Sequence, residues 1–223
     1  MELLLIFWDL IVNLDKHLAS LLAQYGVWVY LILFLIVFCE TGLVVTPFLP
    51  GDSLLFIAGA LTATGTGADQ LGLLTLNILL IAAAILGNTT NYWIGRYFGP
   101  KVFGWEDSRF FNRRAFEKAH AFYEHHGGKT IVITRFLPIL RTFAPFVAGV
   151  AQMTHLRFQS YNVAGGVLWV VSLTVGGYLF GNIPWVKHNL TLIVLGIVVI
   201  SLIPAATAFV RERRSRVRGG AAR

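Results

Sequence analysis

Long apolar runs alternate with short polar breaks along most of this 223-residue chain. The clearest runs cover residues 21–39, 71–95, 160–181 and 190–210. Each is close to the length of about 20 residues that an α-helix needs to cross the hydrocarbon core of a bilayer. The pattern therefore predicts an all-α integral membrane protein with about four transmembrane helices.

Two further apolar segments, residues 43–64 and 130–150, are interrupted by proline and glycine. A proline removes a backbone donor, and the carbonyl that it frees has to be satisfied away from lipid. We therefore expect two re-entrant hairpins here instead of straight spans. The residues expected to shape them are Pro47, Pro50, Gly51, Gly59, Pro138, Pro145 and Gly149. If both segments crossed the membrane, the chain would have about six spans and the same terminal orientation.

The two interrupted segments share a short repeat. Phe-Leu-Pro at 48–50 precedes Ala-Gly at 58–59, and the same order recurs at 136–138 and 148–149. So short a match can arise by chance in a chain rich in Phe and Leu. However, paired interrupted segments in the two halves of a membrane protein are typical of inverted-repeat transporters, whose substrate site lies near the midplane. The pattern thus favours an inverted-repeat arrangement.

The segments outside these runs predict the domain limits and the topology. Polar residues at every third or fourth position of 1–24 indicate an amphipathic helix, and the acidic start argues against a cleaved signal peptide. A membrane domain, 25–210, contains a basic loop at 96–129 with an interfacial helix, and a basic tail follows at 211–223. Because positively charged loops stay in the cytoplasm, we expect both termini to be cytoplasmic.

Composition narrows the classes of function. Hydrophobic residues make up 56% of the chain and charged residues 13%, which excludes a secreted disulfide scaffold, a disordered chain and a typical soluble enzyme. The net charge of +7 lies beside apolar runs, as topology signals do, so nucleic acid is not an expected partner. A single cysteine, Cys39, and loop histidines without a matching carboxylate pattern predict neither a metal site nor a cofactor.

Four charged residues lie in or beside the predicted hairpins: Glu40, Asp52, Arg135 and Arg141. A charge at the middle of a spanning helix costs about 2.5–3.5 kcal/mol, so it normally faces a partner or a wet cavity. One interpretation is that Glu40 and Arg135 only mark membrane boundaries, with side chains that reach the headgroups. In the other, both arginines bind phosphate through their fixed fork of donors, and both carboxylates carry protons.

The second interpretation predicts a transporter driven by a proton gradient. Its partners would be membrane lipids, a lipid-linked phosphate and protons, and a homodimer is one assembly to consider. Asn88, Asn91 and Tyr92 would either line a polar pathway or join helices by hydrogen bonds. One alternative is an energy-independent scramblase, in which the charges only open a groove for headgroups. Another is a lipid phosphatase, although the chain lacks the nucleophile motifs expected of such an enzyme.

Three stretches carry a family resemblance. They are FLPGDSLLFIAG after Glu40, NYWIGRYFG at 91–99, and RFLPILRTFAPFVAGVAQM at 135–153, which Phe158 and Asn162 follow. These stretches resemble the DedA family of bacterial inner-membrane proteins, whose domain is also called SNARE-associated or VTT. The resemblance covers roughly residues 30–180, which is nearly the whole predicted membrane domain.

The resemblance implies re-entrant hairpins, an inner (plasma) membrane location and lipid translocation, with undecaprenyl phosphate or a phospholipid as cargo. It also implies that Glu40 and Asp52 match the family's essential acidic residues, and that Arg135 and Arg141 match its essential basic ones. One departure is the sequence Gly-Asn-Thr-Thr-Asn at 87–91, where many members carry an acidic residue. We therefore expect any proton step to depend on the two acidic residues above.

Overall fold

The computed structural model describes residues 20, 25–43, 51–64, 72–102, 128–181, 183 and 196. Its helices are α3 (Trp28–Gly42), α4 (Gly51–Thr64), α5 (Leu73–Val102), α7 (Lys129–Thr134), α8 (Pro138–Val150) and α9 (His155–Gly181). No strand occurs in these ranges, so the all-α class is confirmed for them. The expectations for the N-terminal segment, the central part of the basic loop, the last span, the tail, Pro47 and Pro50 lie outside the described residues.

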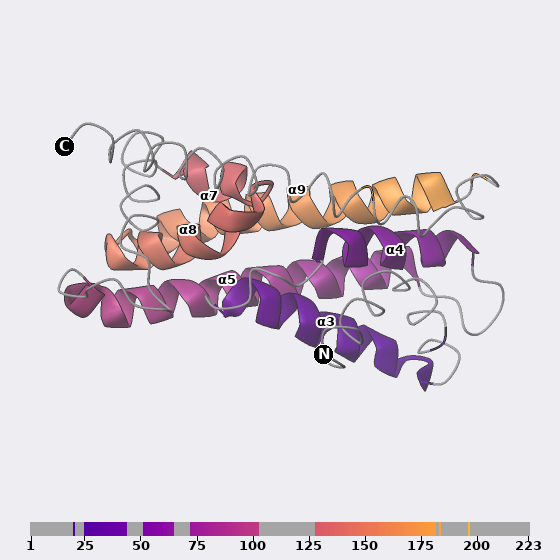
Figure 1. The fold of residues 1–223 in the computed structure, drawn as a ribbon, viewed down its shortest axis with the longest axis horizontal. Helices are drawn as coiled ribbons and strands as arrows, with labels where there is room; N and C mark the ends of the chain where they lie inside the picture. Colours follow the sequence, from indigo (N-terminus) through magenta and orange to yellow (C-terminus); the bar gives the residue numbers. More distant parts are fainter. Residues whose placement is uncertain are drawn as a thin grey trace, which may run out of the picture.

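Two long apolar helices, α5 and α9, form the centre of the molecule and run in opposite directions (Figure 1). They contain 30 and 27 residues. At 1.5 Å per residue, each is about 40 Å or longer, which exceeds the hydrocarbon core of about 30 Å. Only 33% of the apolar window in each helix is buried, and apolar surface that faces outward suits a lipid solvent. Both helices can cross a bilayer.

The helices that match the predicted spans reach beyond them. α5 continues past residue 95, where the sequence predicted an end, and α9 begins before residue 160. α3 includes Glu40, whereas the sequence predicted a span that stops just before it. Polar residues at the ends of these runs are therefore part of the helices.

Two short helices, α4 and α8, begin near the middle of the molecule and run outward in opposite directions (Figure 1). They contain 14 and 13 residues, so each is about 20 Å long and too short to cross a bilayer alone. The segment 130–150 breaks at 135–137, directly before Pro138. Pro145 lies inside α8 and does not end it, so the expected second interruption is wrong. Re-entrant hairpins remain a prediction that these lengths favour.

Each short helix packs against the long helix from the other half of the chain. α4 packs on α9, and two glycines allow this approach. A Cβ atom at Gly59 would overlap with the carbonyl oxygen of Thr174, and one at Gly177 would overlap with the carbonyl oxygen of Phe56. The backbones of the two helices are therefore in direct contact, as in other small-residue helix pairs of membrane proteins.

The same contact recurs between α8 and α5. A Cβ atom at Gly149 would overlap with the carbonyl oxygen of Tyr92, and one at Gly95 would overlap with that of Phe146. In every case the glycine follows its helix's contacting carbonyl by three residues. The same packing thus occurs in both halves of the chain, and the first turns of α4 and α8 are joined by the contact between Asp52 and Arg141.

The largest apolar core lies where α3, α4, α5 and α9 meet. It contains fully buried side chains such as Leu33, Leu55, Leu80 and Trp169. This core fixes α3, α4, α5 and α9, the first two of which carry Glu40 and Asp52.

Candidate functional site

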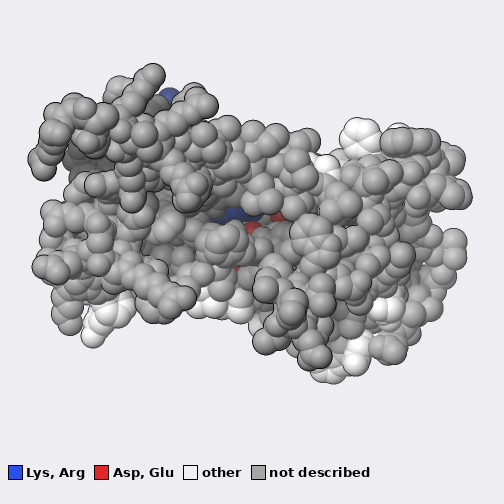
Figure 2. Space-filling model, in the orientation of Figure 1, with Lys and Arg blue, Asp and Glu red and all other residues white. Residues whose placement is uncertain are grey.

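Three charged side chains from three helices meet inside the bundle. Arg141 Nη1 donates to Asp52 Oδ1 at 2.7 Å, and Arg141 Nη2 lies 3.4 Å from Asp52 Oδ2. The same Nη1 lies 3.6 Å from Oε1 of Glu40. The side chains of Arg141, Glu40 and Asp52 are 6%, 3% and 20% exposed. Figure 2 shows acidic and basic atoms next to each other in a hollow near the middle of this face.

Short helices and close packing bring these groups together. Asp52 lies in the first turn of α4, and Arg141 lies in the first turn of α8. A Cβ atom at Gly51 would overlap with the carboxylate of Glu40, so this glycine leaves the space in which the carboxylate lies. Asn91 of α5 joins α3 to α8, because its Nδ2 donates to the backbone carbonyls of Thr41 and Thr142.

Trp169 of α9 contributes an aromatic ring and a hydrogen-bond donor to this site. Its Nε1 donates to Asp52 Oδ1 at 2.9 Å. Arg141 Cζ lies 4.9 Å from the centroid of the indole ring, and Arg135 Cζ lies 6.0 Å from it, both within cation–π range. The sequence analysis did not single out Trp169, because a tryptophan inside an apolar run carries no sign of a polar partner.

Arg135 lies at the break between α7 and α8. Its Nη2 donates to the side-chain oxygen of Asn162 at 2.6 Å and lies near the backbone carbonyls of Asn162 and Ala84. Its Nε and Nη1 are buried and have no hydrogen-bond partner in the described part of the chain. No ion pair joins Arg135 to a described carboxylate.

These positions contradict the boundary interpretation of Glu40 and Arg135. The side chain of Arg135 is 1% exposed and that of Glu40 is nearly as buried, so neither reaches outward to the headgroups. Both belong to the interior arrangement around Trp169.

The three predicted polar residues of α5 all make contacts between helices. Asn88 Nδ2 donates to Asn162 Oδ1 at 3.2 Å, close to Arg135, and Asn91 lies beside Arg141 as described above. Tyr92 has a different place: its hydroxyl donates to the carbonyl of Met153 and accepts from Arg96. Its ring stacks on Phe158. Asn88 thus shares the Asn162 oxygen with Arg135, and Asn91 bonds to the backbone next to Glu40 and Arg141, whereas Tyr92 ties α5 to the turn between α8 and α9.

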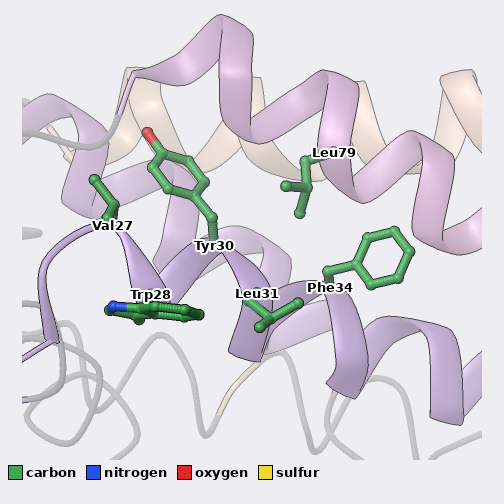
Figure 3. Close-up of a pocket in the computed structure, with 6 residues that line it drawn as sticks. All are labelled: Val27, Trp28, Tyr30, Leu31, Phe34 and Leu79. Carbon is green, nitrogen blue, oxygen red and sulfur yellow. The ribbon is translucent and has the colours of Figure 1, made fainter.

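A separate apolar pocket lies between the start of α3 and α5 (Figure 3). Its lining residues are Val27, Trp28, Tyr30, Leu31, Phe34 and Leu79. None of them is charged, so this pocket is distinct from the charged site. The described residues also contain no group of three or more His, Cys, Asp or Glu side chains that could hold a metal ion.

Comparisons with known proteins place most of the chain in one domain family. The VTT domain model matches residues 49–179, a range that includes Asp52, Arg135, Arg141 and Trp169. No solved structure matches the chain.

Curated relatives extend the match to nearly the whole chain. Protein DedA of Escherichia coli is 53% identical over 218 residues, which are 98% of this chain and 99% of the relative. An uncharacterized membrane protein of Mycobacterium tuberculosis is 44% identical and covers 82% of this chain and 79% of its own. Inner membrane protein YghB of Escherichia coli is 36% identical, covering 78% and 75%. The chain is therefore a membrane protein and belongs to the DedA family, whose members carry the VTT domain.

Proposed function

We propose that this protein is a proton-coupled translocase for a lipid phosphate, such as undecaprenyl phosphate or a phospholipid, in the inner membrane. The observation that carries the proposal is the buried cluster in which Arg141 contacts both Asp52 and Glu40, with Arg135 as a second buried cation. Charged side chains inside a membrane bundle cost free energy, so they are rare there and usually belong to substrate or ion pathways.

The arrangement of helices supports this proposal. The charged groups lie where two short helices of opposite direction begin, between two long antiparallel helices. Binding sites of secondary transporters are often formed in this way, at interrupted helices near the bilayer midplane. In this proposal α4 and α8 belong to re-entrant hairpins that open to opposite sides, and both termini lie in the cytoplasm.

A phosphate-bearing lipid suits the two arginines. Guanidinium groups bind phosphate through parallel hydrogen bonds, and carboxylates in an apolar interior can exchange protons. The enzyme alternative has less support, because the described residues near the arginines offer amides and carboxylates but no histidine. Two of the relatives are named as membrane proteins.

The test is lipid movement in proteoliposomes that contain undecaprenyl phosphate, with and without an imposed pH gradient. We expect movement that depends on the gradient and that is lost in Arg141→Ala. Arg157→Ala is the matched control, because Arg157 is an exposed arginine of α9. Lipid movement that does not depend on the gradient would support a scramblase instead, and release of inorganic phosphate would support a phosphatase.

A further inference from the structure

The four charged side chains of this site sum to zero. They are two carboxylates, Glu40 and Asp52, and two guanidinium groups, Arg135 and Arg141. A net charge in a low-dielectric interior is costly, whereas a neutral set of charges is much less so. Any proton or anion that enters this interior changes the sum, so the charge balance limits which loaded states are favourable.

The carboxylates are shared unevenly between the two arginines. Arg141 faces both carboxylates, so this group of three has one negative charge in excess. Arg135 has no described carboxylate partner, so it contributes one positive charge that no ion pair balances. The two arginines are therefore not equivalent, although the sequence suggests the same role for both.

Arg135 is the arginine with donors that no described residue uses. The donors of Arg141 are directed at Asp52, whereas Nε and Nη1 of Arg135 are buried without an acceptor among the described residues. Gly165 lets the arginine lie directly on α9, because a Cβ atom there would be 3.2 Å from Nε. A buried guanidinium with two unused donors is a suitable partner for a phosphate oxygen.

Glu40 is the carboxylate that can take up a proton at the least cost. Asp52 accepts hydrogen bonds from both Arg141 and Trp169. Glu40 has a longer contact to Arg141 and a hydrogen bond from the backbone of Gly51, while its Oε2 has no hydrogen-bond partner among the described residues. When Glu40 is protonated, Asp52 still neutralises Arg141.

The groups that face Glu40 come from the helices packed against α3. They are Arg141 of α8 and Asp52 of α4, together with the backbone of Gly51. The titratable residues of α5 near this level, Tyr92 and Arg96, are bound at the carbonyl of Met153 instead. Proton uptake at Glu40 therefore depends on Arg141 and Asp52.

We propose that Arg135 binds the anionic headgroup while Glu40 takes up a proton, and that the two bind together, one proton for each negative charge. The proton alone leaves the interior with one excess positive charge, and the anion alone leaves it with one excess negative charge. Together they restore the neutral sum of the empty site. Because the coupling is a free energy shared by both sites, each ligand raises the affinity for the other to the same extent. This inference rests on the proposed function and specifies how anion binding and proton uptake are coupled at the same site.

The test measures proton uptake when the purified, detergent-solubilised full chain binds dihexyl phosphate. This phosphodiester keeps a single negative charge near neutral pH, so any proton taken up belongs to the protein. We expect one proton per bound anion, measured with a pH indicator in weak buffer beside a binding titration. The affinity of the wild type should then fall tenfold for each pH unit above the titration of Glu40.

Two variants separate the roles. Glu40→Gln should bind dihexyl phosphate without proton uptake and with an affinity that no longer depends on pH. Arg135→Gln should lose binding and uptake together, whereas Arg157→Gln, at an exposed position, should behave as the wild type. The wild-type pH dependence tests the inference even if a variant fails to fold.

The outcomes that contradict the inference differ from those that contradict the proposed function. Proton uptake that persists in Glu40→Gln, or unchanged binding of dihexyl phosphate by Arg135→Gln, would overturn the roles assigned to Glu40 and Arg135. Gradient-driven transport without proton uptake on binding would do the same and leave the proposed function intact. A wild-type protein that neither binds the phosphodiester nor moves lipid phosphate would overturn both.

Discussion

The indole N–H of Trp169 and the carboxylate of Asp52 are joined by a hydrogen bond of 2.9 Å inside the bundle. The same carboxylate oxygen accepts from Arg141, so one atom of Asp52 links α9 to α8. The face of the indole ring lies toward both arginines. Trp169 therefore holds Asp52 in place and lies beside both arginines.

Trp169→Phe removes this donor and keeps an aromatic ring. We expect the free energy of unfolding to fall by about 1.5–3 kcal/mol, because a hydrogen bond to a charged group is lost. Trp93→Phe is the matched control, since Trp93 is 51% exposed on α5. Thermal unfolding in detergent compares the two, and an equal effect of both changes would contradict the role of Trp169.

Asp52→Asn should destabilise the protein more than Glu40→Gln does. Asp52 neutralises Arg141 through close hydrogen bonds, whereas Glu40 lies farther from it. Removing the closer partner of a buried charge costs about 3–5 kcal/mol, and removing the weaker contact should cost much less. Unfolding midpoints of the two single variants test this order. If Glu40→Gln were the more destabilising change, the assignment of the proton to Glu40 would lose its basis.

Gly51→Ala should abolish transport. The added Cβ atom would overlap with the carboxylate of Glu40, so either α4 or that side chain has to move. Gly176→Ala is the control, because nothing lies within 4 Å of a Cβ atom at that position of α9. This control should retain transport and gain about 0.5–1 kcal/mol of helix stability. Normal transport by Gly51→Ala would show that the close approach of α4 to α3 is not needed.

Gly59→Ala and Gly149→Ala should have similar effects, since they occupy equivalent contacts in the two halves. Each new Cβ atom would overlap with a backbone carbonyl of the facing long helix. We expect both variants to unfold at lower temperature than Gly176→Ala, as measured by size-exclusion chromatography after heating. A large effect at only one of the two positions would argue against equivalent packing in the halves.

The sequence predicted the charged residues well because charges stand out in an apolar run. It did not reveal which charges pair, since pairing between Arg141 and Asp52 depends on two short helices that begin side by side. Asn162 appeared only as part of a family motif, although it accepts from Arg135. The sequence did not indicate a role for Trp169, because its indole N–H is the one polar group of an otherwise apolar side chain.

The repeat is visible in the sequence, but its two parts are separated by different numbers of residues. Phe-Leu-Pro recurs from 48–50 to 136–138, whereas Ala-Gly recurs from 58–59 to 148–149, so the two parts of the match are offset differently. The equivalent contacts in the structure follow the second register, in which Phe56 corresponds to Phe146. Only the backbone contacts with α9 and α5 identify this register, and those depend on the packed structure.

Proteoliposomes that carry either a pH gradient or a membrane potential provide the most direct test of proton-coupled translocation. With a lipid phosphodiester as cargo, one proton and one negative charge move together, so the transported set is electrically neutral. A pH gradient should therefore drive movement, and an imposed potassium diffusion potential at equal pH should not. Movement driven by the potential alone, or movement that the pH gradient leaves unchanged, would contradict the account.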